Sequence, residues 1–203
     1  MAVLGALLAT VLLSALGLAI ALLGIGEMTL ASRERTARSL RLAAEGAAQA
    51  ALIDLATLAT WDPVLARGGV DEASGVRARF SEIDLAPPAP WSGRPLDLRA
   101  LTLATRTASD ALRSPADGVQ RWRLFAWAPF ERLVPGAGSG PWYVVVWVAD
   151  DRADTDGDPD RDSNGTIAVR AVALGPDDAS AALEATLARE AGRVRAVAIR
   201  PRP

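Results

Sequence analysis

The chain has 203 residues, a formal net charge of −2 and a hydrophobic fraction of 50%. It contains no cysteine and no histidine, and every basic residue is an arginine. These absences exclude disulfides, thiolate or imidazole catalysis, thiolate or imidazole metal ligands and lysine Schiff-base chemistry. We therefore expect no enzyme, and the charge balance provides no basic field that would attract nucleic acid as a partner.

The first predicted element is an apolar helix at residues 2–26, which ends before the first charged residue, Glu27. At 1.5 Å per residue this stretch is roughly 37 Å long, enough to cross a hydrocarbon core of about 30 Å. It has no basic n-region and is longer than the apolar core of a secretory signal. We therefore expect a retained, single-pass membrane anchor.

Residues 27–60 continue the helical pattern without proline and consist mostly of good helix formers. Apolar residues at helical spacing form one stripe, made of Leu40, Ala43, Ala47, Ala50 and Leu55. Pro63, in the sequence Trp61-Asp62-Pro63, predicts the end of the helix. We accordingly divide the chain into an N-terminal helix at 1–60, with an anchor at 2–26 and an amphipathic half at 27–60, and a head domain at 61–203.

An apolar half-helix followed by an amphipathic half-helix resembles the N-terminal region of type IV pilins and pseudopilins. The segments 13–19 (LSALGLA) and 43–52 (AAEGAAQAAL) are similar to those of PilX-type minor pilins. The resemblance covers residues 1–60 well and the remainder in outline. It implies a structural subunit that takes part in the assembly, priming or tip of a bacterial type IV pilus or a related secretion pseudopilus.

The resemblance also implies partners and a location. The N-terminal helix would contact other pilins or pseudopilins, in the inner membrane or in a surface filament, with small residues such as Gly5, Ser14 and Gly17 allowing close approach. Glu27 would mark the end of the anchor. Most mature pilins carry glutamate at the fifth position, where this chain has Gly5. Gly5 either argues against the pilin interpretation or indicates a tip or initiation role.

The topology of the anchor is a second departure from the pilin pattern. Four arginines follow the anchor and no basic residue precedes it, namely Arg33, Arg35, Arg38 and Arg41. The positive-inside rule would place the head in the cytoplasm, whereas a pilin head is extracytoplasmic, in the periplasm. We expect a basic leader, cleaved or lost in defining the start of the chain, to reconcile the two.

The head is predicted to begin with irregular structure and one short helix. Residues 64–96 are rich in glycine and proline, which indicates a loop. Residues 96–112 allow a helix with Asp97 as its N-terminal cap. Trp61 and Trp91 lie at loop edges, where one of them could be exposed.

Five strands are predicted in the remainder of the head, at 120–128, 142–149, 166–174, 182–189 and 193–199. Their short connections favour an antiparallel sheet with its apolar face on the amphipathic half of the long helix. The predicted fold class is therefore α+β. In the first strand, alternation places Trp122, Leu124 and Ala126 on one face and Phe125 on the other. Trp122, Trp127, Trp142 and Trp147 are expected in the core.

Residues 150–165 are the segment with the most chemistry, because carboxylates alternate along a glycine-containing loop. Carboxylate oxygens converging from such a loop suit Ca²⁺, which takes six to eight oxygen ligands. The candidate ligands are Asp154, Asp156, Asp158, Asp160, Asp162 and Asn164. The stretch 160–165 fits the first half of an EF-hand loop, but Ala171 at the twelfth position and the strand that follows exclude a true EF-hand.

Two other interpretations of this loop stay open. It can be a solvated acidic hairpin loop, since Asp, Asn and Gly are common turn residues. The sequence Asn164-Gly165-Thr166 also matches the N-glycosylation pattern, although Asn-Gly is equally a favoured turn pair.

The sequence leaves three functional hypotheses. The first and preferred one is the structural pilin-like subunit. The second is a membrane-tethered binding or adhesion module that depends on Ca²⁺. The third is a metal-dependent hydrolase built on aspartate pairs, which the lack of histidine and cysteine disfavours.

Overall fold

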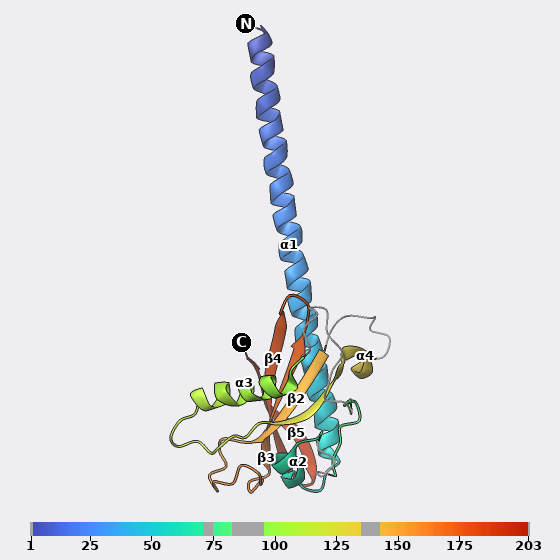
Figure 1. The fold of residues 1–203 in the computed structure, drawn as a ribbon, viewed down its shortest axis with the longest axis vertical. Helices are drawn as coiled ribbons and strands as arrows, with labels where there is room; N and C mark the ends of the chain where they lie inside the picture. Colours follow the sequence, from blue (N-terminus) through green and yellow to red (C-terminus); the bar gives the residue numbers. More distant parts are fainter. Residues whose placement is uncertain (1, 71–74, 83–95, 135–142, 203) are drawn as a thin grey trace. The chain divides into compact units, whose positions relative to one another are not determined.

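The computed structural model describes residues 2–70, 75–82, 96–134 and 143–202 (Figure 1). Its helices are α1 (Ala2–Ala56), α2 (Asp62–Arg67), α3 (Leu98–Ala111) and α4 (Phe130–Leu133). Its strands are β1 (Arg123–Pro129), β2 (Tyr143–Asp150), β3 (Thr166–Leu174), β4 (Ser180–Glu190) and β5 (Arg193–Arg202). The chain forms two compact units, Met1–Arg38 and Ser39–Pro203, so the C-terminal part of α1 belongs with the head.

The first unit is helical and apolar. Among the described residues, one helix, Thr10–Ala56, is long and apolar enough to cross a membrane by length and composition. Its large apolar side chains up to Ile25, such as Leu12 and Leu23, are exposed within the chain. Exposed apolar surface is unfavourable in water by about 25 cal/mol per Å². An apolar surrounding would therefore stabilise this segment.

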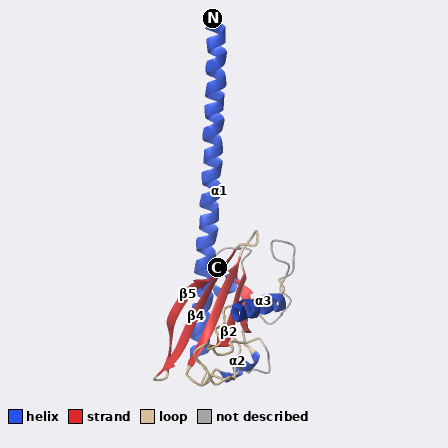
Figure 2. Cartoon of the chain, turned by 90° about the vertical axis from the view of Figure 1, so that its left-hand side faces the viewer, coloured by secondary structure: helices blue, strands red, loops and turns tan. Residues whose placement is uncertain are grey.

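The second unit contains one five-stranded sheet in the order β1-β2-β3-β4-β5, with every neighbouring pair antiparallel (Figure 2). Each strand pairs with the next in the chain, and the β4–β5 connection is a tight turn at Ala191 and Gly192, both with positive φ. The predicted α+β fold, a long N-terminal helix on an antiparallel sheet, is confirmed. This is a pilin-like architecture.

The main core lies between the sheet and the C-terminal part of α1. The stripe of α1 is fully buried there at Leu40, Ala43, Ala47 and Leu55, as predicted, whereas Ala51 is fully buried in place of Ala50. The opposite wall comes from alternate residues of the strands, including Val144, Val146, Val169, Ala171, Leu183 and Leu187. Alanine on the helix lets the helix and sheet backbones approach closely, so the interior fills without large side chains from α1.

A second cluster covers the other face of the sheet and contains three predicted core tryptophans. Trp122, Trp127 and Trp147 are buried there against Leu98 of α3, and the Trp147 indole donates a hydrogen bond to Thr102 Oγ1 at 2.9 Å. Asp97 caps α3 as predicted, since its Oδ1 accepts the N–H groups of Arg99 and Ala100. Every residue of β2 is buried because both faces of the sheet are covered. Trp91 and Trp142 lie outside the described residues.

The face assignment predicted for the first strand was wrong at one residue. A register shift between Leu124 and Ala126 interrupts the alternation of β1. Phe125 and Ala126 consequently both join the cluster on the α1 side. An extra residue in one strand reverses the side on which all later residues point, and hydrophobic alternation gives no sign of such a bulge.

Helix boundaries also differ from the predicted ones. α1 ends at Ala56, before residue 60, where the Thr57 hydroxyl donates to the carbonyl of Asp54 at 2.7 Å and competes with the helical backbone pattern. Pro63 does not end a helix but lies in the first turn of α2, a position that suits proline because no helical N–H is needed there. Both α2 and α4 are short helices that the sequence analysis did not predict.

Trp61 and Arg189 connect the end of α1 to β4. Trp61 is fully buried and its indole donates to the carbonyl of Leu55 at 3.0 Å. The Arg189 guanidinium lies 4.3 Å from the centroid of the Trp61 ring and donates to the carbonyls of Leu58 and Ala59. A cation over an indole face and donors to the carbonyls of the segment that follows α1 both stabilise this junction.

We expect Arg189→Ala to lower the free energy of unfolding by about 1–3 kcal/mol, because it removes a cation–π contact and two hydrogen bonds to the carbonyls of Leu58 and Ala59. Chemical denaturation of the full chain in detergent measures this change. Arg195→Ala is the matched control, since its partner Glu190 is also exposed and such pairs contribute about 0–1 kcal/mol. Equal losses in the two variants would contradict the assigned role of Arg189.

Candidate functional site

The acidic loop joins the two neighbouring strands β2 and β3 at one end of the sheet. Asp150 is the last residue of β2 and pairs in register with Ile167 of β3. The loop lies on the segment that follows α3: the Gly118 N–H donates to the Arg152 carbonyl at 2.9 Å, and the Gln120 side chain donates to the Asp150 carbonyl at 3.2 Å. The loop is therefore held by the folded head at its first residues.

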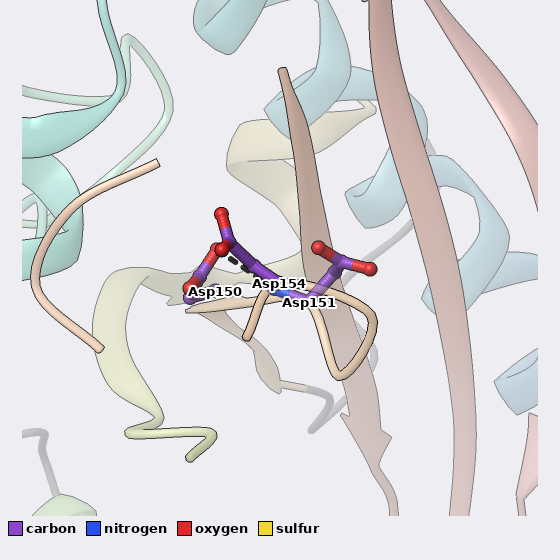
Figure 3. Close-up of side chains that lie close together, drawn as sticks. All are labelled: Asp150, Asp151 and Asp154. Carbon is purple, nitrogen blue, oxygen red and sulfur yellow. Dashed lines mark hydrogen bonds between the residues drawn. The ribbon is translucent and has the colours of Figure 1, made fainter. Parts of the chain in front are cut away.

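Three carboxylates meet where the loop begins. Asp150, Asp151 and Asp154 each offer an oxygen within 4.8 Å of the other two, and Figure 3 shows the three side chains. They are only 2%, 8% and 4% exposed. In the part of the chain that the structure describes, this is the one group of acidic side chains close enough together to share a metal ion.

Of the six predicted ligands, only Asp154 belongs to this group. Asp156 and Asp158 are exposed, and each accepts the backbone N–H two residues further on, that of Asp158 and Asp160 respectively. These are Asx turns, in which the carboxylate shapes the loop. The alternation of aspartates along residues 154–160 is therefore mainly a series of turns.

The other three predicted ligands have partners elsewhere. Asp160 forms ion pairs with Arg121 at 2.9 Å and Arg123 at 3.1 Å. Asp162 Oδ1 accepts the N–H groups of Gly165 and Thr166 at 2.7 and 3.1 Å. The Asn164 amide donates to Asp151 Oδ1 at 2.7 Å, so Asn164 touches the cluster as a donor.

Sequence analysis missed Asp150 and Asp151 as site residues. Both were counted as the beginning of the acidic loop, and neither falls in the D-x-D-x-N spacing that suggested ligands. The available signal was position: a carboxylate at the last residue of the wholly buried strand β2, or directly after it, is held at the end of the core. A buried carboxylate requires a proton, a cation or several hydrogen bonds.

The three carboxylates have different electrostatic environments. Burial, together with the nearby charge of Asp154, raises the pKa of Asp150 to about 8. Its carboxylate accepts one hydrogen bond among the described contacts, from the N–H of Asp151 at 2.9 Å. Burial would also raise the pKa of Asp154, but hydrogen bonds from the Ser163 hydroxyl and N–H lower it below its usual value. Hydrogen bonds therefore offset the burial of the Asp154 carboxylate but not that of the Asp150 carboxylate.

Burial raises the pKa of Asp162 as well, against the N–H groups of Thr166 and Gly165, which lower it. Two of the aspartates that shape this loop therefore disfavour ionisation. A divalent cation reverses this preference, since it stabilises every ionised carboxylate that binds it. The arrangement can bind a hard cation through the carboxylates of Asp150, Asp151 and Asp154. Asn164 orients the carboxylate of Asp151, and Ser163 orients that of Asp154.

The residues predicted to act in assembly all lie on α1. Gly5, Ser14, Gly17 and Glu27 are exposed within the chain. A Cβ atom added at Gly5 or Gly17 would meet nothing within 4 Å. Glycine in a helix interior costs about 1 kcal/mol relative to alanine. No contact among the described residues requires glycine at these two positions.

No protein-family model, no curated protein and no solved structure matches this chain.

The stability of the head should fall as the pH rises, in the absence of divalent cations. With a pKa of about 8 in the folded chain against 3.8 normally, Asp150 keeps a proton that the unfolded chain releases. Stability from this residue is complete below the normal pKa and is lost as the pH approaches the raised one. Asp150→Asn should remove this dependence and stabilise the chain at pH 8 by about 1–4 kcal/mol.

Thermal unfolding across this pH range, with a chelator present, measures the effect as the difference between the two proteins. The difference cancels contributions from the titrating groups that do not interact with Asp150. Parallel pH profiles for the natural chain and Asp150→Asn would contradict the assignment.

Gly118→Ala should displace the acidic loop. A Cβ atom there would lie 2.0 Å from the carbonyl oxygen of Asp154, and a backbone atom cannot move aside alone. We expect a loss of about 2–4 kcal/mol in unfolding free energy and increased amide exchange in the loop. Gly157→Ala, at an open position of the same loop with positive φ, tests whether backbone strain alone gives the same result. Loop exchange that is unchanged in Gly118→Ala would contradict the contact.

Proposed function

We propose that this protein is a minor pilin-like structural subunit of a bacterial type IV pilus or a related secretion pseudopilus. The main support for the proposal is that α1 has two roles, one in its N-terminal part and one in its C-terminal part. Its N-terminal part has no charged residue from Ala2 to Gly26, and its C-terminal part forms one wall of the head core. A helix that is both an apolar span and a core element ties a head to a membrane or to a bundle of similar helices.

The glycines of the apolar part support assembly through the helix. Gly17 and Gly5 weaken the isolated helix, and none of the residues that the structure describes fills the space beside them. Helices in lipid associate through small residues, because backbones then approach closely. Gly5 and Gly17 would therefore contact the helices of other subunits.

We further propose that the protein resides in the inner membrane with its head on the extracytoplasmic side, and that it acts at the tip or in priming. The resemblance of residues 1–60 to minor pilins supports this proposal.

Filament association is the direct test. The protein should be recovered with filaments sheared from cells, and Gly17→Leu should reduce this recovery several-fold while leaving membrane insertion unchanged, because the larger side chain separates helices. Leu18→Ile is the control, since it keeps both volume and apolarity. Normal recovery of Gly17→Leu, or a protein that never leaves the membrane fraction of filament-forming cells, would contradict the proposal.

Orientation is tested in the same cells with Thr155→Cys, which introduces the only thiol of the chain at an exposed loop residue. This residue is preferable to Ser163, whose hydroxyl donates to Asp154. A membrane-impermeant maleimide should label intact spheroplasts. Labelling only after lysis would mean that the arginines after the anchor set the topology and that the head is cytoplasmic.

A second candidate function is a membrane-tethered, Ca²⁺-dependent binding or adhesion module. The specific observation in its favour is the buried group of Asp150, Asp151 and Asp154. Three carboxylates give a large part of the oxygen ligands that Ca²⁺ requires, and carbonyls and water can provide the rest. Bound Ca²⁺ would order the loop, and the two candidate functions are compatible in a tip subunit.

Calcium should therefore raise the melting temperature of the full chain in detergent. Millimolar Ca²⁺, in the range that extracellular sites require, should raise it by several degrees over a chelator. Asp154→Asn should abolish the shift, and the control Asp177→Asn/Asp178→Asn, in the exposed turn before β4, should keep it. A shift retained in Asp154→Asn, or absent from the natural chain, would exclude this site.

A further inference from the structure

β5 leaves one edge of the sheet open (Figure 2). It pairs with β4 on one side and with no described strand on the other. A ten-residue edge strand presents a row of unpaired N–H and C=O groups that can accept another strand. Pro201, which lacks an N–H, limits this row near its end, and a register shift that leaves Val197 without a partner in β4 interrupts it in the middle.

An apolar groove of about 610 Å³ runs beside β5, on the side of the sheet that carries the C-terminal part of α1. Ala196 and Ile199 of β5 line it, and Leu52 and Ile53 of α1 lie across from them. Ile199 and Ile53 stay 61% and 54% exposed. The helix thus covers the first four strands more fully than it covers β5, and the groove is wide enough for apolar side chains from outside.

The opposite face of β5 carries three arginines. Arg193, Arg195 and Arg200 lie on it and are exposed, and Glu190 and Glu184 of β4 stand across from Arg193 and Arg200. Arg195 pairs with Glu190 at 2.7 Å, whereas Arg193 and Arg200 form no ion pair with any residue in the described ranges. Antiparallel pairing with a second copy of β5 would bring arginines near arginines, which is destabilising. The charge therefore favours an acidic partner over self-association.

We propose that β5 and the adjacent groove bind an extended acidic segment of another protein by strand addition. Main-chain hydrogen bonds form along the free edge of β5, and side chains of the added strand alternate between the two faces. Apolar residues enter the groove beside Ala196 and Ile199. Acidic residues lie on the other face and pair with Arg193 and Arg200. The proposal is independent of filament assembly.

The experiment uses the full chain in detergent micelles and a labelled, acetylated peptide of alternating valine and glutamate, long enough to span β5. Fluorescence anisotropy should show saturable binding that weakens with added salt, and empty micelles give the background. Arg193→Glu/Arg200→Glu should weaken binding at least about tenfold, because both charge pairs become repulsive. Arg99→Glu/Arg113→Glu, at exposed sites away from the sheet edge, should change it less than about twofold.

Three further measurements separate strand addition from attraction between charges alone. A peptide of the same composition, with its valines and glutamates in two blocks, should bind more weakly. Ile199→Gln should weaken binding although every charge of the chain is kept. Hydrogen exchange should slow at residues 193–200 when the alternating peptide is bound.

The proposal is overturned if no saturable binding occurs, if the block peptide binds equally well, or if exchange slows elsewhere and not in β5. It is also overturned if the natural chain forms a dimer that Ile199→Gln dissociates. That outcome would assign the groove to a second copy of the chain.

Discussion

The packing of the alanine-rich face of α1 against the sheet is the contact on which the rest of the head depends. Ala43, Ala47 and Ala51 are fully buried there between the helix and the strands. Their small side chains bring two backbones together, so the core is filled mainly by branched residues from the sheet. Once the sheet lies on α1, its other face needs a cover, which α3 and three tryptophans provide. The ends of β2 and β3, and with them the acidic loop, are fixed by the same packing.

The fold could be predicted largely from residue patterns because its elements follow each other in simple order. The wholly buried run of β2, the proline-free helix and the short turns each indicate one structure, and neighbouring strands in the sequence are neighbours in the sheet. The errors in the predicted structure were local. The irregularity at Phe125 leaves no trace in hydrophobic alternation, and α2 depends on the burial of Val64 and Leu65, which is a tertiary effect.

The candidate metal site was predicted less well, for a physical reason. An aspartate in a loop can bind a metal ion, accept backbone N–H groups or pair with an arginine, and all three uses produce the same sequence pattern. Asp156 shapes a turn, and Asp160 pairs with two arginines that precede it by more than thirty residues. Only the fold shows that Asp150 and Asp151 are held beside Asp154. Spacing along the chain therefore indicated the loop, and the fold shows which of its aspartates are buried close enough together to be candidate ligands.

The alanine stripe of α1 also bears on how the protein is made. During synthesis α1 emerges before any strand, and the partners of its stripe, among them Val169 and Leu187, come much later in the chain. Until then this face of the helix has nothing to pack against. Alanine presents far less apolar surface than leucine, so the helix forms few non-native contacts and has little tendency to aggregate before the strands are made. The residue that allows close packing in the finished head thus also protects the nascent chain.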